Sequence, residues 1–207
     1  MKEVFKKSVF AGILIGIGGV AYISCTSKIV GALLFSFGLF TICSYGLYLF
    51  TGKNGYFFEY SKENKINLLV VLLGNYVGAT IVGLLFRYVA SESNLNLVKN
   101  IAECKLAYEI PKLFVLSVFC GIMMFLAVDL YKHNEGFTKL ISIFMGVMIF
   151  ILAGFEHCIA NMFYFSAAMI FSAKMYLYLM VMIIGNMVGS IAIWSLRYYK
   201  KKVKQVS

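Results

Sequence analysis

The residues best suited to chemistry lie in the stretch FEHCIANMF, Phe155 to Phe163. It places Glu156 and His157 inside an apolar run that begins near Phe137 and continues through Phe165. A charged group at mid-bilayer costs about 2.5–3.5 kcal/mol or more, so ionisable residues at that depth usually mark functional sites. Histidine also titrates close to physiological pH. We therefore expect a functional site here, rather than a histidine satisfied within a core.

Composition places this site in a membrane protein. The 207 residues are 61% hydrophobic, contain one proline and have a positive mean hydropathy, which excludes an ordinary soluble or disordered chain. The net charge of +10 comes from lysines in short connections and in the tail 197–204, which favours cytoplasmic loops over nucleic-acid binding. The five cysteines form no CxxC pair, so we expect neither a disulfide framework nor a metal site, and no cofactor.

The hydrophobic pattern predicts an all-α integral membrane fold with six transmembrane helices. The segments are 8–25, 29–50, 67–89, 112–131, 138–157 with an interrupted continuation to about 172, and 175–197. The basic leader and the first segment together resemble a signal peptide, but the segment approaches a full span and its opening letters recur later, so we retain it as a span. The bias of basic residues predicts that both termini are cytoplasmic.

Two motifs recur in the same order in each half of the chain. SVFAGI at 8–13 returns as SVFCGI at 117–122, and GNYVG at 74–78 returns as GNMVG at 185–189. Because each half holds three spans, the second half enters the membrane from the opposite side, as in inverted-repeat transporters. We predict one transmembrane channel domain with halves at about 8–89 and 112–197, followed by a cytoplasmic basic tail at about 198–207.

The repeat also predicts where the helices break. Shifting His157 back by one repeat reaches the end of the second span, where Thr51 begins a polar, glycine-containing stretch. Breaks at membrane depth are tolerated where they line a cavity or are buried in protein. We expect Thr51 and His157 to be a symmetry-matched polar pair. We assign Asn75 and Asn186 of the GNxxG motifs to helix packing, because asparagine forms hydrogen bonds across helix interfaces.

These residues carry a family resemblance. FEHCIANMF resembles the signature of the formate/nitrite transporter family, and further motifs agree in order along essentially the whole chain: AGILIGIGG at 11–19, FSFGL at 35–39, LFTG at 49–52, GNYVG at 74–78, AECK at 102–105, LAV at 126–128 and GNMVG at 185–189. The resemblance implies a homopentamer of aquaporin-like protomers with broken second and fifth helices. Each protomer would have its own pore for small monovalent anions or their acids.

The resemblance also implies roles for individual residues. Thr51 would sit in the loop that interrupts the second span and face His157, while Glu156 and Asn161 would fix the broken helices and the surroundings of the histidine. The remaining positions are a cytoplasmic-side constriction of Phe35, Leu39 and Phe50; Leu49 and Phe150 beyond the central chamber; Lys105 at the outer vestibule; and Lys7, or Lys6, at the inner mouth.

Three departures from the family pattern bear on function. No amphipathic helix precedes the first span, and Gly121 stands where the fourth span usually carries an asparagine. The stretch Tyr56 to Asn64 leaves little room for a second half-helix. We therefore keep a non-transporting membrane subunit as an alternative.

The predicted function is a pH-dependent channel or transporter in a bacterial cell membrane for formate or nitrite, which pass with or as the conjugate acid. Apolar rings favour the neutral acid because an uncompensated charge in hydrocarbon is costly. As the alternative, the chain is a hydrosulfide or lactate channel of the same family. An intramembrane enzyme is disfavoured, since no serine or cysteine nucleophile is paired with a second histidine.

Overall fold

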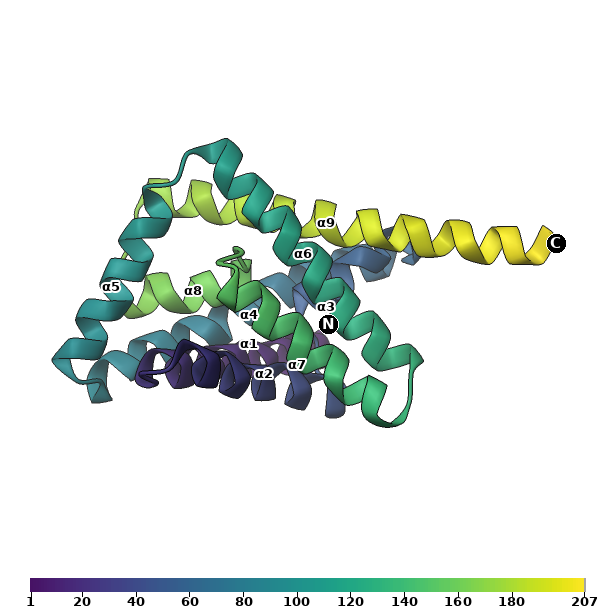
Figure 1. Ribbon diagram of the computed structural model, residues 1–207. Coiled ribbons are helices and arrows are strands. Elements are labelled where there is room, and N and C mark those ends of the chain that lie inside the picture. The colour runs from purple at the N-terminus through teal and green to yellow at the C-terminus, as the bar shows by residue number, and fades with distance from the viewer. Residues whose placement is uncertain (207) are drawn as a thin grey trace.

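The computed structural model describes the backbone of residues 1–206 and the side chains of residues 1–197. Over that range the chain is helical and has no strand. Its elements are α1 (Lys2–Ser24), α2 (Lys28–Ser44), α3 (Phe50–Lys53), the 3₁₀ helix η1 (Asn54–Glu59), α4 (Lys62–Val89), α5 (Glu92–Leu106), α6 (Ile110–His133), α7 (Gly136–Leu152), α8 (Cys158–Ala167) and α9 (Ala173–Val206). The backbone of α9 extends to Val206 beyond the other helices (Figure 1), whereas the side chains of the predicted basic tail lie outside the described residues.

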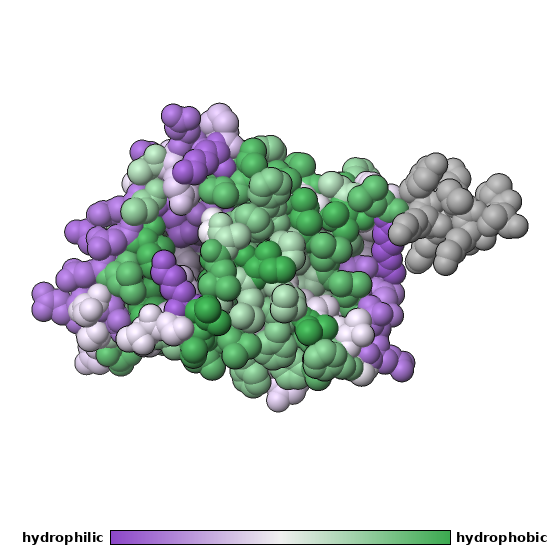
Figure 2. Space-filling view, in the orientation of Figure 1, coloured by the Kyte–Doolittle hydropathy of each residue, from purple (hydrophilic) through white to green (hydrophobic). Residues whose placement is uncertain are grey.

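Among the described residues, four helices are long and apolar enough to cross a membrane: α1, α4, α6 and α9. The second and fifth predicted spans each consist of two shorter helices, α2 followed by α3 and α7 followed by α8. Figure 2 shows a broad hydrophobic band between two hydrophilic ends, one of them over α5. The all-α membrane fold and its two broken spans are therefore as predicted, while the crossing of a bilayer by all six spans stays a prediction.

The two breaks begin with the same turn. Gly46 and Gly154 follow α2 and α7 with φ of +60° and +71°, a left-handed conformation that glycine adopts without steric cost. The next residue in each half donates its N–H five residues back, Leu47 to Ile42 O and Phe155 to Phe150 O, both at 2.9 Å. This bond is typical of the Schellman motif at helix C-termini. Local sequence therefore ends both helices without a proline.

Two buried asparagines hold the next helices in place after the breaks. Asn75 Oδ1 accepts the N–H of Phe50 at 2.8 Å, and Asn186 Oδ1 accepts the N–H of Cys158 at 2.9 Å. Their Nδ2 groups donate at 2.9 Å to Tyr48 O and at 2.8 Å to Glu156 O, respectively. These bonds satisfy the free backbone groups that any broken helix leaves. The packing assignment for both asparagines is confirmed, and each also caps the start of a half-helix.

Close helix crossings bring these asparagines into position. A Cβ atom at Gly12 would lie 2.3 Å from Asn75 O, and one at Gly121 would lie 2.1 Å from Asn186 O. Only glycine fits where α1 crosses α4 and where α6 crosses α9. Gly121, where the family usually has asparagine, is therefore a helix contact in this chain.

Among the connections, one helix was not foreseen and one expectation was wrong. The residues between the third and fourth spans form a further helix, α5, whose N-cap Ser91 accepts the N–H of Asn94 at 3.3 Å. The second half-helix is also present, since α3 and η1 are helical from Phe50 to Glu59. The tighter 3₁₀ winding allows this short stretch to form helical turns.

Candidate functional site around His157

His157 and Thr51 meet inside the molecule, as predicted. Thr51 Oγ1 lies 2.8 Å from His157 Nε2, and both residues are almost fully buried. His157 is the N-cap of α8, while Thr51 lies in α3, so each belongs to a different break. The Phe150 ring packs on the imidazole with centroids 5.4 Å apart. The fold thus brings two polar side chains together in apolar surroundings.

The two residues are nevertheless not equivalent positions of the repeat. Asn75 binds the N–H of Phe50, and Asn186 binds the N–H of Cys158, so Phe50 corresponds to Cys158. One residue earlier, His157 corresponds to Leu49. The expectation of a symmetry-matched pair was therefore wrong in register. The second half supplies the His157 imidazole. The first half supplies the Thr51 hydroxyl, two positions after Leu49, which is the equivalent of His157, so the site is asymmetric.

The hydrogen bonds define the tautomer of His157. Its Nδ1 accepts the backbone N–H of Ala160 at 3.1 Å, which caps α8. A nitrogen that accepts an N–H carries no proton, so the neutral ring has its proton on Nε2. Nε2–H therefore donates to Thr51 Oγ1, and the Thr51 hydroxyl keeps its own proton available as a donor. A second proton on Nδ1 would require the cap to break.

The Glu156 carboxylate is bound by two side chains beside the histidine. Lys105 Nζ lies 2.9 and 2.7 Å from its two carboxylate oxygens, and Asn161 Nδ2 donates to Oε2 at 2.8 Å. The Glu156 side chain is 1% exposed and that of Lys105 is 15% exposed. Asn161 also donates to His157 O at 3.0 Å. Lys105, expected as a vestibule lysine, thus has its charge balanced by a buried carboxylate.

Two cavities lie on either side of this buried layer. The histidine cavity, of about 140 Å³, is lined by residues that include His157, Phe150, Asn161 and Lys105. The tyrosine cavity, of about 170 Å³, is lined by Leu39, Leu49, Lys53 and Lys132 together with Tyr48 and Tyr131. The cavities share no lining residue. Gly52, next to Thr51, lines the tyrosine cavity, so the Thr51–His157 contact lies between the two cavities.

The apolar residues between the cavities are paired differently from our expectation. Phe35 packs edge-on against Phe150 with centroids 6.0 Å apart, and Leu39 shares the tyrosine cavity with Leu49. Phe50 lines a separate apolar groove beside α4 and α9. All five side chains are buried. We therefore group Phe35 with Phe150 and Leu39 with Leu49 as two successive apolar layers.

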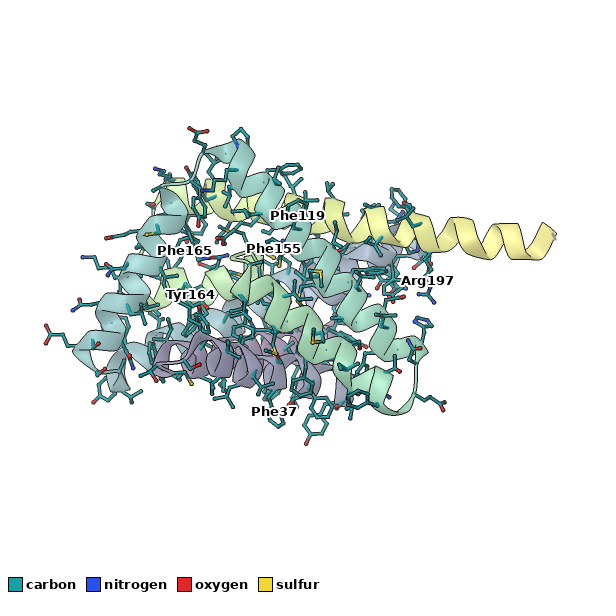
Figure 3. All side chains as sticks on the ribbon, in the orientation of Figure 1. Phe37, Phe119, Phe155, Tyr164, Phe165 and Arg197 are labelled. Carbon is teal, nitrogen blue, oxygen red and sulfur yellow. The ribbon has the colours of Figure 1, made fainter. Side chains whose placement is uncertain are left out.

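A polar cluster at the end of α6 was not predicted from the sequence. Asp129 Oδ1 accepts a hydrogen bond from the Tyr56 hydroxyl at 2.7 Å and pairs with Arg197, and His133 Nδ1 lies 3.4 Å from the same oxygen. Figure 3 shows Arg197 on α9 near this end of the molecule. The cluster joins η1 to α6 and α9. An aspartate within the last two turns of an apolar span was the available signal.

Charged and phenolic groups surround the start of α1 as well. Lys7, expected at the inner mouth, pairs with Glu3 at 3.1 Å and lies 5.4 Å from the Tyr48 ring centre. A further cavity of about 180 Å³ reaches Tyr60, which follows η1. Burial, with a smaller effect of the Glu59 charge, raises the pKa of Tyr60 to about 12. Its hydroxyl is therefore neutral at physiological pH.

Comparison with known sequences gives consistent matches along the chain. The family model described as formate/nitrite transporter matches residues 1–200. The formate-nitrite transporter of Plasmodium falciparum is 28% identical over 233 residues, covering 93% of this chain and 75% of that protein. The formate channel FocB of Escherichia coli is 28% identical over 182 residues, covering 78% of this chain and 64% of that protein.

Comparison with solved structures gives the same fold. An ion channel of the FNT family superposes with a TM-score of 0.85 at 22% identity, covering 96% of this chain and 90% of that one. A pentameric formate channel with formate bound superposes with a TM-score of 0.81 at 24% identity, covering 98% and 97%. At these identities the likeness establishes the fold of the chain.

Proposed function

Because the chain belongs to the formate/nitrite transporter family of membrane channels and transporters, we propose that it conducts small monovalent anions such as formate or nitrite. In this proposal the anion crosses with its proton or as the conjugate acid. The observation that carries the proposal is the buried Thr51–His157 hydrogen bond between two cavities that share no wall.

The apolar layers favour a neutral form of the substrate. A passing ion would lose most of its water between Leu39 and Leu49, and again between Phe35 and Phe150. An unpaired ion in a low-dielectric region is so costly that protonation becomes the cheaper state, since desolvation raises the pKa of an acid. The flux of a weak acid should therefore rise as the pH falls.

The Thr51 and His157 side chains lower the barrier between the layers. The histidine donates to Thr51 through Nε2–H, which leaves the threonine hydroxyl free to donate to an oxygen or sulfur of the substrate. A hydrogen bond to an anion is stronger than one between neutral groups, so this donor stabilises the substrate where water is scarce. The ring acts in this scheme as a fixed donor, because its other nitrogen caps α8.

The assembly and placement follow from the same proposal. A solved structural neighbour is a pentameric formate channel, which supports a homopentamer with one pore per protomer here. Most basic residues lie in the connections on the side of the two termini, which supports cytoplasmic termini. The membrane in this proposal is that of a bacterial cell.

The decisive experiment measures uptake of formate, nitrite and hydrosulfide into proteoliposomes between pH 5 and 8. Wild type should pass at least one of them, faster at lower pH. His157→Ala should reduce this flux about tenfold or more, since the Thr51 donor loses its partner and α8 its cap. His157→Asn should retain much of the flux with the same pH profile, because asparagine is a good N-cap and a neutral donor.

The matched control is His133→Asn, which replaces the other histidine of the chain, outside the buried layer. It should leave flux and pH profile unchanged. A His157→Asn variant with a flattened pH profile would show that the imidazole itself delivers protons. Absence of flux for all three anions, from folded and oligomeric wild-type protein, would contradict the proposed function and favour a non-transporting subunit.

A further inference from the structure

The tyrosine cavity carries cationic groups that the function described above does not use. Lys53 follows Thr51 by two residues in α3, and Lys132 lies near the end of α6. Both line this cavity, as do the buried side chains of Leu39 and Leu49. The cavity therefore places two ammonium groups directly outside an apolar layer. Its volume of about 170 Å³ corresponds to roughly five or six water molecules in the liquid.

Neither lysine has an anionic partner of its own. Among the described side chains, Lys53 and Lys132 form no ion pair or hydrogen bond, and each lies over a tyrosine ring, 4.0 Å from the Tyr48 centre and 4.3 Å from the Tyr56 centre. A face of the ring attracts a cation but leaves its hydrogen-bond donors free. Both ammonium groups thus remain able to donate to an incoming anion.

The surrounding charges leave this cavity positive. Lys132 and Lys7 are close enough to Lys53 to repel its charge. Two carboxylates act on Lys132: Asp129, which is paired with Arg197, and Glu59, which keeps its negative charge although it accepts a hydrogen bond from the Trp194 indole. The three cations Lys53, Lys132 and Arg197 therefore outnumber these two carboxylates. Lys53 and Lys132 repel each other, and an anion between them relieves this repulsion. The histidine cavity differs, since the charge of its Lys105 is balanced by Glu156.

We propose that Lys53 and Lys132 form a binding subsite for a small carboxylate or oxyanion in the tyrosine cavity. The subsite holds the anion with part of its hydration shell before it meets Leu39 and Leu49. It raises the local concentration of the anion on this side of the channel. A doubly charged oxyanion such as sulfate also fits the subsite but does not cross the apolar layers, and therefore competes with the permeating anion. This inference rests on the proposed channel function.

The test combines transport with direct binding. Initial formate uptake into proteoliposomes is measured against formate concentration at fixed ionic strength, with and without sodium sulfate, for wild type and Lys53→Gln/Lys132→Gln. The half-saturating formate concentration should rise about fivefold in the double variant, because an exposed ion pair contributes up to about that factor. The maximal rate should change less than twofold. Sulfate should inhibit wild type competitively and lose at least tenfold of its potency against the double variant.

Calorimetric titration of the detergent-purified pentamer with sodium sulfate gives a readout that is independent of transport. Wild type should bind about one sulfate per chain, and the double variant should lose this binding. Lys62→Gln is the matched control, since it removes one charge near the start of α4, outside the tyrosine and histidine cavities. It should bind sulfate like wild type. Lys53→Arg/Lys132→Arg keeps both charges and should retain binding if the glutamine variant does not fold.

The outcomes separate this inference from the function on which it rests. Wild-type protein that passes no anion contradicts the channel function, whatever its sulfate binding. Normal flux with unchanged half-saturation and unchanged sulfate binding in the double variant overturns the subsite alone. An equal loss in Lys62→Gln also overturns it, because the effect would then come from general surface charge, which salt screens.

Discussion

At the scale of single residues, a buried ion pair lies beside the histidine, and its charges are costly to remove from water. Glu156 is 1% exposed and binds Lys105 through both carboxylate oxygens. Such pairs add little net stability, but removal of one partner leaves an uncompensated buried charge. The pair therefore fixes α5 against the start of α8 and positions the backbone that leads into His157.

Lys105→Met should destabilise the protein by about 3–5 kcal/mol, because the Glu156 carboxylate keeps only the Asn161 amide as a charge-stabilising contact. The measurement is unfolding of the detergent-solubilised protein. Lys105→Met/Glu156→Gln should recover more than half of this loss, since no buried charge remains. Equal destabilisation in the single and double variants would show that packing of the lysine stem, and not charge, accounts for the effect.

At the scale of elements, the same contact occurs at both helix breaks: a side-chain amide forms the hydrogen bonds that the missing helical turn would have formed. Asn75 and Asn186 each bridge a backbone N–H at the start of a half-helix and a carbonyl before it. The preceding glycine turns end α2 and α7 in the same way. These equivalent contacts explain why the GNxxG motif recurs in both halves, while the polar residues at the two breaks differ.

Asn186→Ala should cost about 2–6 kcal/mol, because it leaves the Cys158 N–H and the Glu156 carbonyl without partners, at about 1–3 kcal/mol each. Formate flux should fall as α8 loses its position. Asn75→Ala should destabilise to a similar extent through Phe50 and Tyr48. Asn64→Ala, on the exposed first turn of α4, is the control and should behave as wild type in both assays.

The fold could be predicted from the lengths of the apolar segments. Most of the site could be predicted from the few polar residues within those segments. The breaks near Thr51 and His157 follow from polar groups at membrane depth, and the structure brings these two residues together. The register of the repeat was missed because only the Asn75 and Asn186 contacts define it. Helix α5 was missed because its amphipathic surface is short and polar. The proximity of Lys53 and Lys132 could not be predicted, because Lys132 lies at the end of α6, far from Lys53 in the sequence.

At the scale of the whole molecule, the described helices place hydrophilic residues at two opposite ends of a hydrophobic band, as Figure 2 shows. Cys104 is exposed on α5 at one end, and His133 lies at the last residue of α6, which crosses to the other end (Figure 1). The proposed cytoplasmic placement of both termini predicts that α5 faces the outside of the cell.

This orientation is testable with a membrane-impermeant maleimide in a variant whose other four cysteines are replaced by alanine. Cys104 should react in intact cells, because α5 is exposed at the outer end. In a second variant that carries His133→Cys and no other cysteine, labelling should require permeabilised cells. Labelling of the His133→Cys variant in intact cells, with Cys104 protected, would reverse the predicted topology.

The uneven charge of the two cavities also bears on the thermodynamics of transport. The lysines of the tyrosine cavity are unpaired among the described side chains, whereas Lys105 of the histidine cavity is neutralised by Glu156. Such asymmetry lets an anion enter faster from one side, but it speeds the return of the same anion equally at equilibrium. A passive pore with uneven charge therefore changes how fast equilibrium is reached from each side. It does not change the equilibrium itself. Import or export is then decided by the gradients of anion and proton that the cell maintains.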